Sequence, residues 1–336
     1  MFQVLEAATA DALWLKAADW FSVDGIATRQ ESRGGPTFEV LRAALTLEDP
    51  RQRWITSRAP ALNPAFALAE VIWLVCGRND SAFLNYFNPR LPDFAGRGVF
   101  YHGAYGYRLR THFGIDQLER AYRVLSSAQN SRQVVLQIWD TIADLPSDDG
   151  SARAEDVPCN IVALLKVREG RLEWTQVMRS NDLILGLPHN IIQFSSLQEV
   201  LAGWLGVELG SYNHFADSLH LYERDAPVSD RIAPRPLPRN ADSIAVPNVM
   251  SEQSFAELAV LAETLSVPEA TPERILSSFQ QVNLDPGFRN WAAILTADAL
   301  RRRKAFSMMG SVMQECSNAC LAIMFDRWLQ RRRQAP

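Results

Sequence analysis

The chain has 336 residues, 47% of them hydrophobic, and a formal net charge of −4 at pH 7. That length and apolar fraction allow a large buried core in one or two domains, and the slightly negative charge gives no bulk attraction to nucleic acid. Because the sequence has no run of about 18 apolar residues and no signal-peptide pattern at its start, we expect no membrane span and a cytoplasmic location.

The first half of the chain reads as alternating helices and strands. Hydrophobic periodicity predicts helices over residues 11–20, 64–76 and 116–129 and strands over 37–47 and 134–139. Asn63 gives the clearest local signal, because an asparagine can cap a helix whose first residue is a proline, here Pro64. The acidic segment 145–156 is expected to be a surface loop.

A β-hairpin is predicted where two apolar runs, 161–167 and 172–178, flank Arg168-Glu169-Gly170-Arg171. Cys159 precedes the first strand and Arg179 follows the second, so antiparallel pairing brings both to the same end of the hairpin. A nearby guanidinium favours the thiolate form of a cysteine, which is the nucleophilic form. Taken alone, Cys159 reads more readily as a small buried hydrophobe than as a nucleophile.

The second half is predicted to contain a helix over 190–206 and a strand over 208–222, then an irregular connection over 227–247. Helices follow over 251–265 and 271–282 and throughout 285–333. Two basic clusters, at residues 301–304 and 331–333, are expected on a solvated face, with a partner contact or anion binding as alternatives. The four cysteines and five histidines form no cluster with metal-ligand spacing, so no metal is expected.

Three motifs occur in order along the chain. Pro158-Cys159 is followed by the segment 179–190, which reads Arg-Ser-Asn-Asp-Leu-Ile-Leu-Gly-Leu-Pro-His-Asn, and then by His220-Leu221-Tyr222. This pattern resembles the signature of the thymidylate synthase and pyrimidine nucleotide hydroxymethylase family. The likeness is strongest over 134–222, looser over 33–110 and absent beyond about residue 246.

The resemblance implies an α+β fold with a mostly antiparallel sheet flanked by helices. Residues 1–246 would form the catalytic domain. The resemblance does not explain residues 247–336, which are expected to be a helical C-terminal extension that could pack on that domain. The family's subunits pair through their sheets, so the resemblance also implies a homodimer with shared active sites.

For the chemistry, the resemblance implies that Cys159 adds to C6 of a pyrimidine nucleoside monophosphate. The C5 atom then attacks the one-carbon unit of 5,10-methylenetetrahydrofolate. Asn190 would bind the base edge and favour uracil, because its amide can donate to O4 and accept from N3–H. Glu70, on an apolar helix where an unpaired carboxylate is costly, would relay protons together with Tyr105.

The phosphate of the nucleotide would be bound by arginines, whose planar forks match phosphate oxygens. Arg33, Arg132 and Arg179 fall at such positions, with Ser180 as a further donor. Arg132 would serve the neighbouring subunit. Gln133 stands where the family has a second consecutive arginine, which predicts a different phosphate contact.

The remaining site residues would hold the sugar and the folate. His220 and Tyr222 are two apart on a strand, so they face the same side and would bind the ribose hydroxyl. Asp182 would bond the pterin, Gly186 would let the folate approach the backbone, and Phe94 is the aromatic residue left to wall the folate.

Departures from the family pattern bear on the product. Asn160 stands where a histidine is common and Met178 where a glutamine is common, and residues 330–336 show no apolar closing peptide. A dry, closed site favours hydride transfer and a methyl product, whereas a looser site admits water. Hydroxymethylation is therefore favoured over reductive methylation. An inactive member that binds nucleotide or RNA for regulation, and an enzyme acting on a free or modified nucleoside, stay open as alternatives.

Overall fold

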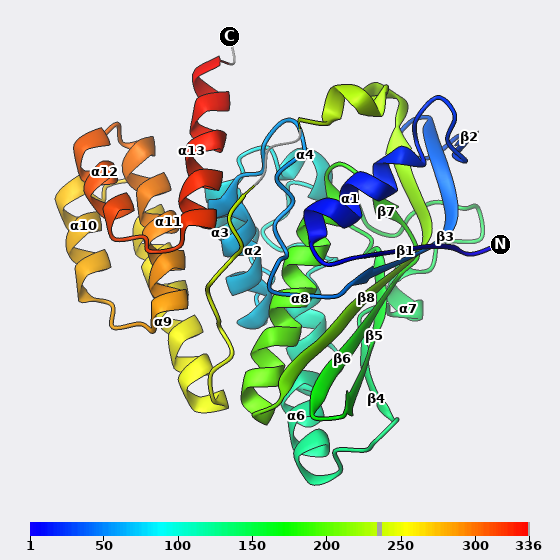
Figure 1. The fold of residues 1–336 in the computed structure, drawn as a ribbon, viewed down its shortest axis with the longest axis horizontal. Coiled ribbons are helices and arrows are strands. Elements are labelled where there is room, and N and C mark those ends of the chain that lie inside the picture. The colour runs from blue at the N-terminus through cyan, green and yellow to red at the C-terminus, as the bar shows by residue number, and fades with distance from the viewer. Residues whose placement is uncertain (234–236, 335–336) are drawn as a thin grey trace.

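One mixed sheet of eight strands forms the centre of the described chain (Figure 1). The computed structural model describes residues 1–233 and 237–334, with side chains described as far as Arg331. The main path of the sheet is β1-β3-β8-β6-β5-β4, while β2 pairs with β3 and β7 with β8. The strands are β1 (Gln3–Ala7), β2 (Thr28–Gln30), β3 (Thr37–Leu47), β4 (Val134–Gln137), β5 (Asn160–Arg168), β6 (Arg171–Met178), β7 (Asn181–Asp182) and β8 (Glu208–Tyr222).

The sheet joins antiparallel and parallel pairs. The pairs β2–β3, β3–β8, β4–β5 and β5–β6 are antiparallel, and β1–β3, β6–β8 and β7–β8 are parallel. The predicted α+β architecture is confirmed. The sheet also contains parallel pairs that the hydrophobic pattern did not reveal, among them β6–β8 in the middle of the sheet. The strands β1, β2 and β7, of two to five residues, carry too little periodicity to be recognised in the sequence.

Helices cover one face of the sheet in successive layers (Figure 1). The long helix α8 lies against β6 and β8, and α2 packs on α8. In chain order the helices up to the connection are α1 (Ala10–Asp19), α2 (Pro64–Val75), α3 (Ser81–Phe87), α4 (Pro92–Ala95), α5 (Tyr105–Tyr107), η1 (Arg108–His112), α6 (Gln117–Ser127), α7 (Thr141–Asp144), α8 (Gly186–Leu205), η2 (Glu223–Asp225) and η3 (Val228–Arg231).

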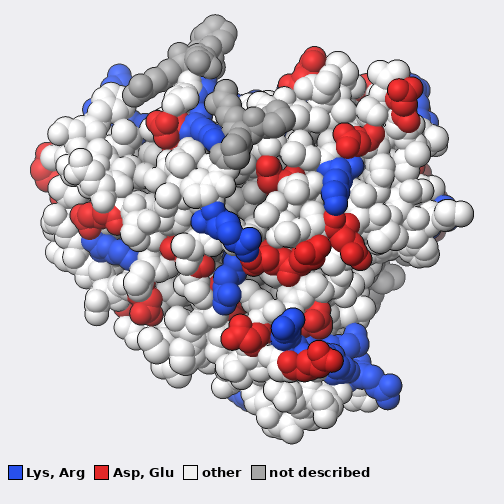
Figure 2. Space-filling view, in the orientation of Figure 1, with Lys and Arg blue, Asp and Glu red and all other residues white. Residues whose placement is uncertain are grey.

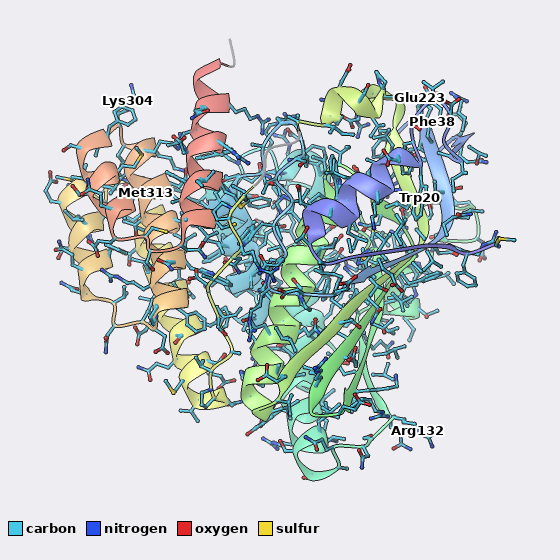
Figure 3. All side chains as sticks on the ribbon, in the orientation of Figure 1. Trp20, Phe38, Arg132, Glu223, Lys304 and Met313 are labelled. Atoms are coloured by element: carbon cyan, nitrogen blue, oxygen red, sulfur yellow. The ribbon has the colours of Figure 1, made fainter. Side chains whose placement is uncertain are left out.

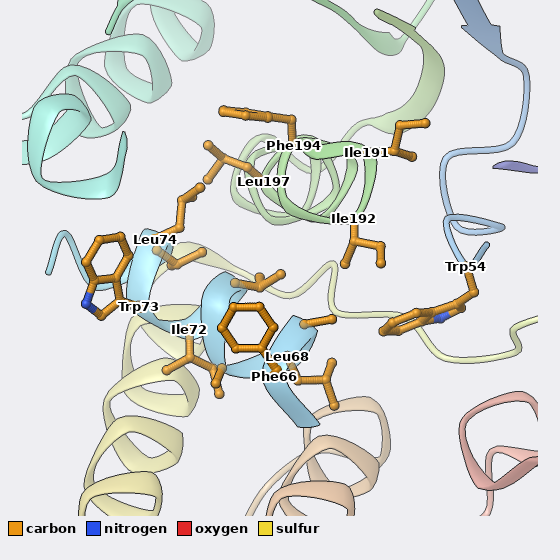
Figure 4. Close-up of a cluster of buried hydrophobic side chains, with 14 of the residues drawn as sticks. Trp54, Phe66, Leu68, Ile72, Trp73, Leu74, Ile191, Ile192, Phe194 and Leu197 are labelled. Atoms are coloured by element: carbon orange, nitrogen blue, oxygen red, sulfur yellow. The ribbon is translucent and has the colours of Figure 1, made fainter. Parts of the chain in front are cut away.

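A hydrophobic core lies between α2 and α8. Figure 4 shows the side chains that fill it, among them Trp54, Phe66, Leu68, Ile72, Trp73, Leu74, Ile191, Ile192, Phe194 and Leu197. The α2 helix begins as predicted, because the Asn63 side chain accepts a hydrogen bond from the Ala65 amide at 3.1 Å. The Trp14 indole donates to the Leu183 carbonyl at 2.8 Å and so joins α1 to the turn before α8.

The C-terminal helices pack on the side of α2 and α8 that faces away from the sheet (Figure 1). They are α9 (Asn248–Ser266), α10 (Pro272–Gln281), α11 (Pro286–Arg302), α12 (Phe306–Gln314) and α13 (Ala319–Gln334). The predicted single helical run over 285–333 is therefore wrong. Lys304 has a positive φ of 58°, which ends the run, and Asn318 starts α13 by accepting from the Cys320 amide at 2.9 Å. The division at residue 246 stays a prediction.

The first basic cluster is not a solvated face, so that expectation is wrong. Arg301 and Arg302 pair with the buried Asp298 at 2.8 and 2.7 Å. Arg303 donates to the carbonyls of Val267 and Ala270 at 2.6 and 2.7 Å, which joins α11 to the segment between α9 and α10. In the second cluster Arg331 donates to the Ala61 carbonyl, and the side chains of 332 and 333 lie outside the described residues.

The surface carries both signs of charge. On the face shown in Figure 2, lysine and arginine side chains lie beside aspartate and glutamate side chains. Within residues 1–233 and 237–334, no helix combines the length and the apolar character that crossing a membrane requires.

Candidate active site

Cys159 is the last residue before β5, and Arg179 is the first residue after β6. The register pairs Asn160 with Met178, so the hairpin brings the cysteine and the arginine together as the spacing predicted. The Arg179 amide donates to the Cys159 carbonyl at 2.9 Å, and its guanidinium donates to the carbonyls of Pro158 at 2.9 Å and Val157 at 3.1 Å. These three bonds fix the backbone that presents the thiol.

Two opposing influences act on the thiol of Cys159. Burial raises the pKa of Cys159 above its ordinary value, while the positive charges of Arg179 and Arg33 act to lower it. Arg33 is exposed and donates to the carbonyls of Ala154 and Glu155 at 3.4 and 3.2 Å, on the segment that leads to the cysteine. The thiol is therefore flanked by cations but partly shielded from water.

A partly open cavity of about 130 Å³ is bordered by Asp156, three residues before the nucleophile. Its polar wall consists of Glu70 from α2, Tyr105 from α5, Asp156 and the Gln193 amide from α8. Glu70 is not the unpaired carboxylate that its apolar helix suggested, because its Oε2 is hydrogen-bonded to Nδ1 of His189. The cavity thus combines groups able to give and to take protons.

Tyr105 lies between the cavity and the nucleophile. Burial raises the pKa of Tyr105, and its hydroxyl is close to the Cys159 backbone and the Asn160 side chain. Its ring packs 5.8 Å from that of Phe194 on α8. A tyrosine with a raised pKa keeps its proton, so the hydroxyl is a donor at this position.

Asn190 is held by a chain of buried polar groups. Its Oδ1 accepts from Asn181 Nδ2 at 2.9 Å, Asn181 Oδ1 bonds His214 Nε2 at 2.9 Å, and His214 Nδ1 bonds the Tyr212 hydroxyl at 3.0 Å. Burial lowers the pKa of His214 to about 3, so its ring is neutral. Tyr212 then donates to Nδ1, His214 donates through Nε2, and Asn181 has only its amide N–H left to offer Asn190.

Gly186 is required by this chain of bonds. A Cβ at this position would lie 2.8 Å from Asn181 Nδ2, so any side chain here would displace Asn181 from Asn190. The folate contact predicted for Gly186 stays a prediction.

The predicted sugar-binding pair lies at the end of β8. The rings of His220 and Tyr222 are 5.2 Å apart and perpendicular, and Ser180 Oγ is 3.4 Å from His220 Nδ1. Burial lowers the pKa of His220, although the Asp182 carboxylate acts to raise it. Arg224 lies over the Tyr222 ring at 3.9 Å. These polar groups are gathered on one side of the strand, as their spacing predicted.

The residues predicted to hold a folate lie in two places. Asp182 accepts from the amides of Ile184 at 2.6 Å and Leu185 at 3.1 Å through Oδ1, and thereby shapes the turn that leads into α8. Burial raises the pKa of Asp182. Phe94 is 51% exposed and borders an open hollow of about 540 Å³ together with Arg33 and Arg97.

Arg132 and Gln133 are not brought to the Cys159 site of their own chain. Both are exposed just before β4, whose Val134 pairs with Leu165, far along β5 from the nucleophile. At about 3.3 Å per residue, the strand separates the two ends by roughly 25 Å. Figure 3 shows Arg132 at one tip of the molecule, away from Glu223 and Phe38 at the other.

Several polar residues of the site escaped the sequence analysis, namely Asn181, Gln193, Tyr212 and Asp156. The sequence does place His189 within the motif and His214 an even number of residues from His220 on the same strand, which makes both candidates for the site. Tyr212 and His214 alternate with less buried residues on β8, so an inward polar pair on a strand was the available signal. Asp156 ends the segment predicted to be a surface loop, and that part of the prediction is wrong because its carboxylate lines the cavity. Within the described ranges, no three His, Cys, Asp or Glu side chains are grouped to hold a metal ion.

A thiol on a fixed loop, close to groups that can give and take protons, suits nucleophilic addition to an electron-poor ring followed by proton transfer. Fold and site together define a transferase of one-carbon groups. The family model described as thymidylate synthase matches residues 27–259, and the chain belongs to that family.

Two relatives are deoxyuridylate hydroxymethyltransferases of phages. The chain is 32% identical to that of Pseudomonas phage M6 over 334 residues, which cover 94% of this chain and 90% of the relative. It is 34% identical to that of Bacillus phage SP01 over 204 residues, or 57% of this chain and 52% of the relative. A thymidylate synthase of Bacillus licheniformis is 30% identical over 213 residues, or 59% of this chain and 72% of the relative.

The electrostatics of the thiol predict how Cys159 reacts with iodoacetamide. Because burial raises the pKa of Cys159, its alkylation rate is expected to rise with pH and to reach its midpoint above the ordinary thiol range. Arg33→Gln removes a cation that lowers this pKa, so the midpoint should move further up. Rates are read by mass spectrometry of the peptide that contains Cys159.

The matched control is Arg97→Gln, since Arg97 borders the same hollow as Arg33 but its side chain is 84% exposed. This variant should leave the midpoint unchanged. A midpoint at or below the ordinary thiol range would contradict the balance of burial and charge described for Cys159.

Proposed function

We propose that the protein is a deoxyuridylate hydroxymethyltransferase. Cys159 adds to C6 of the uracil ring, C5 takes the one-carbon unit from 5,10-methylenetetrahydrofolate, and water rather than hydride completes the group. The proposal rests on how much of the chain aligns with each relative. The relative of that name in phage M6 aligns over 94% of the chain, C-terminal helices included, whereas the Bacillus licheniformis thymidylate synthase aligns over 59%.

The preference for uracil is supported by the orientation of Asn190. The bond from Asn181 turns Oδ1 of Asn190 toward Asn181, and Nδ2 is 3.4 Å from Gln193 Oε1, too long for a strong bond. The amide N–H is thus available to O4 of uracil, and the second lone pair of Oδ1 to N3–H. Cytosine offers a donor where this N–H points and would be disfavoured.

Methylenetetrahydrofolate fits the residues around the nucleophile. When bound it supplies the one-carbon unit that joins C5. Asp182 binds the turn through Oδ1, and Oδ2 accepts no hydrogen bond from any residue in the described part of the chain, which leaves it for a pterin N–H. Phe94 and Arg33 on the rim of the open hollow offer an aromatic face and a cation to the rest of the cofactor.

A homodimer that shares its active sites belongs to the same proposal. Apolar side chains lie in two neighbouring rows on the uncovered face of the sheet. Val135 pairs with Leu164 in one row, and Val177 pairs with Phe215 in the next. None of the four is buried in a single subunit. Pairing through this face would cover both rows, and Arg132 at the sheet's end would then serve the partner's nucleotide phosphate.

The product of the reaction tests the function directly. Deoxyuridylate incubated with the protein and methylenetetrahydrofolate should gain CH₂O, read by mass spectrometry of the nucleotide. Cys159→Ser is the control and should give no product, because it lacks the thiolate. A gain of CH₂ would show a methyl-forming synthase, and no change with intact protein would favour a binding role.

Mixing two inactive variants tests the shared site. Neither Cys159→Ser nor Arg132→Ala is expected to be active alone. If Arg132 serves the partner's site, a mixed dimer has one site with both residues intact. After unfolding and refolding equal amounts together, about one quarter of wild-type activity should return, since half of the dimers are mixed. Activity no greater than the sum of the separate variants would contradict sharing through Arg132.

A further inference from the structure

Asp156 places a carboxylate in the cavity that Glu70 and Tyr105 also line. Its Oδ2 accepts from the Gly103 amide at 3.0 Å, while Oδ1 accepts no hydrogen bond from any residue in the ranges that the structure describes. Gly103 has to be a glycine for this contact, because a Cβ there would lie 2.8 Å from Asp156 Oδ2. One oxygen of the carboxylate is thus anchored and the other is left open to the cavity.

The position of Asp156 relative to the nucleophile is fixed. Only Val157 and Pro158 separate it from Cys159, and the Arg179 guanidinium holds the carbonyls of both. A short segment bound at each intervening residue cannot swing freely. The carboxylate therefore stays at a set offset from the sulfur that would bond to C6 of the ring.

Asp156 does not help Cys159 to become a thiolate. The charge of Asp156 raises the pKa of Cys159, against the effect of Arg179. Because Asp156 opposes formation of the thiolate that attacks C6, we look for its role in a later step of the reaction. Burial also raises the pKa of Asp156, which makes its carboxylate a better base than an exposed one.

Each of the two cavity carboxylates has one oxygen bound, and they differ in the group that binds it. Glu70 Oε2 is bound to Nδ1 of His189, whose ring packs 5.2 Å from Phe66, whereas Asp156 Oδ2 accepts from the backbone amide of Gly103. The second oxygen of each carboxylate accepts no hydrogen bond from any described residue. A histidine ring can exchange a proton with Glu70 and a backbone amide cannot do so with Asp156, so Asp156 is the carboxylate that has no titratable partner bound to it.

The cavity has the size and polarity to hold water. A water molecule occupies about 30 Å³ of liquid, so roughly four fit into a space of this size. A stable water also needs two to four polar partners. Glu70, Tyr105, Asp156 and Gln193 supply them, on an otherwise apolar lining.

We propose that Asp156 is the general base that takes a proton from the water that completes the hydroxymethyl group. This role rests on the proposed hydroxymethyltransferase function. The water oxygen bonds to the exocyclic methylene carbon on C5, and its proton passes to Asp156 Oδ1. The electron pair of the C5–methylene double bond moves onto the C4 oxygen. It then returns to form the C5–C6 double bond as the bond between C6 and the Cys159 sulfur breaks, and Asp156 releases its proton to solvent.

The test separates proton loss at C5 from the addition of water. Asp156→Asn is assayed with deoxyuridylate tritiated at C5, methylenetetrahydrofolate and added 2-mercaptoethanol. Tritium release in a single turnover should match the wild type, because C5 loses its proton before water adds. Formation of the hydroxymethyl product should fall about 100-fold or more, the usual weight of a general base. The thiol should instead capture the methylene group as a thioether.

Asp148→Asn is the matched control, since Asp148 is an exposed carboxylate of the same segment, and it should behave as wild type. Thermal unfolding checks that Asp156→Asn is folded, with Asp156→Ser as the second variant. Wild-type hydroxymethyl formation by a folded variant, or equal loss of tritium release and product, would overturn the role of Asp156. A methyl product from the unchanged protein would instead refute the proposed function itself.

Discussion

The site depends on three hydrogen bonds that Arg179 donates to the backbone carbonyls of residues 157–159. They join the ends of β5 and β6, and two guanidinium nitrogens, Nε and Nη2, donate to carbonyls that no strand pairs. A buried carbonyl without a donor is costly, so the arginine stabilises an irregular segment that the sheet alone would leave frayed. The same side chain supplies the positive charge nearest the thiol. One residue thereby fixes both the geometry and the electrostatics of Cys159.

The segment between Arg179 and Asn190 is largely devoted to orienting one amide. Asp182 accepts hydrogen bonds in the turn that leads into α8, and Gly186 leaves space for the Asn181 side chain. The neutral His214 ring donates to Asn181 Oδ1, so the amide N–H of Asn181 points at Asn190 Oδ1 and fixes the orientation of the Asn190 amide. Buried polar chains are favourable only when each member is satisfied, and this one is complete from the Tyr212 hydroxyl onward. The selectivity for a base would then be set several residues from the base.

The sequence predicted features that depend on residues close together in the chain, and it missed those that depend on residues far apart. The hairpin around Cys159, the Asn63 cap and the strand 208–222 are local, so spacing and residue type sufficed. The Glu70–His189 bond joins two helices far apart in the chain, and no local pattern reports it. Arg303 was misread because its partners are carbonyls, which look alike in every sequence. Arg301 and Arg302 were misread because the burial of their partner Asp298 depends on tertiary packing. The phosphate-binding role proposed for Arg132 would require a second subunit, which the sequence of one chain does not place.

The proposed chemistry requires a bond between the Cys159 sulfur and C6 of a pyrimidine ring held in this site. The most direct measurement is mass spectrometry of the protein after incubation with 5-fluorodeoxyuridylate and methylenetetrahydrofolate. Fluorine at C5 cannot leave as a proton does, so the reaction should stop with nucleotide and folate both attached. The account predicts a stable ternary adduct on the peptide that contains Cys159. An unmodified protein, or an adduct on Cys76, Cys316 or Cys320, would contradict it.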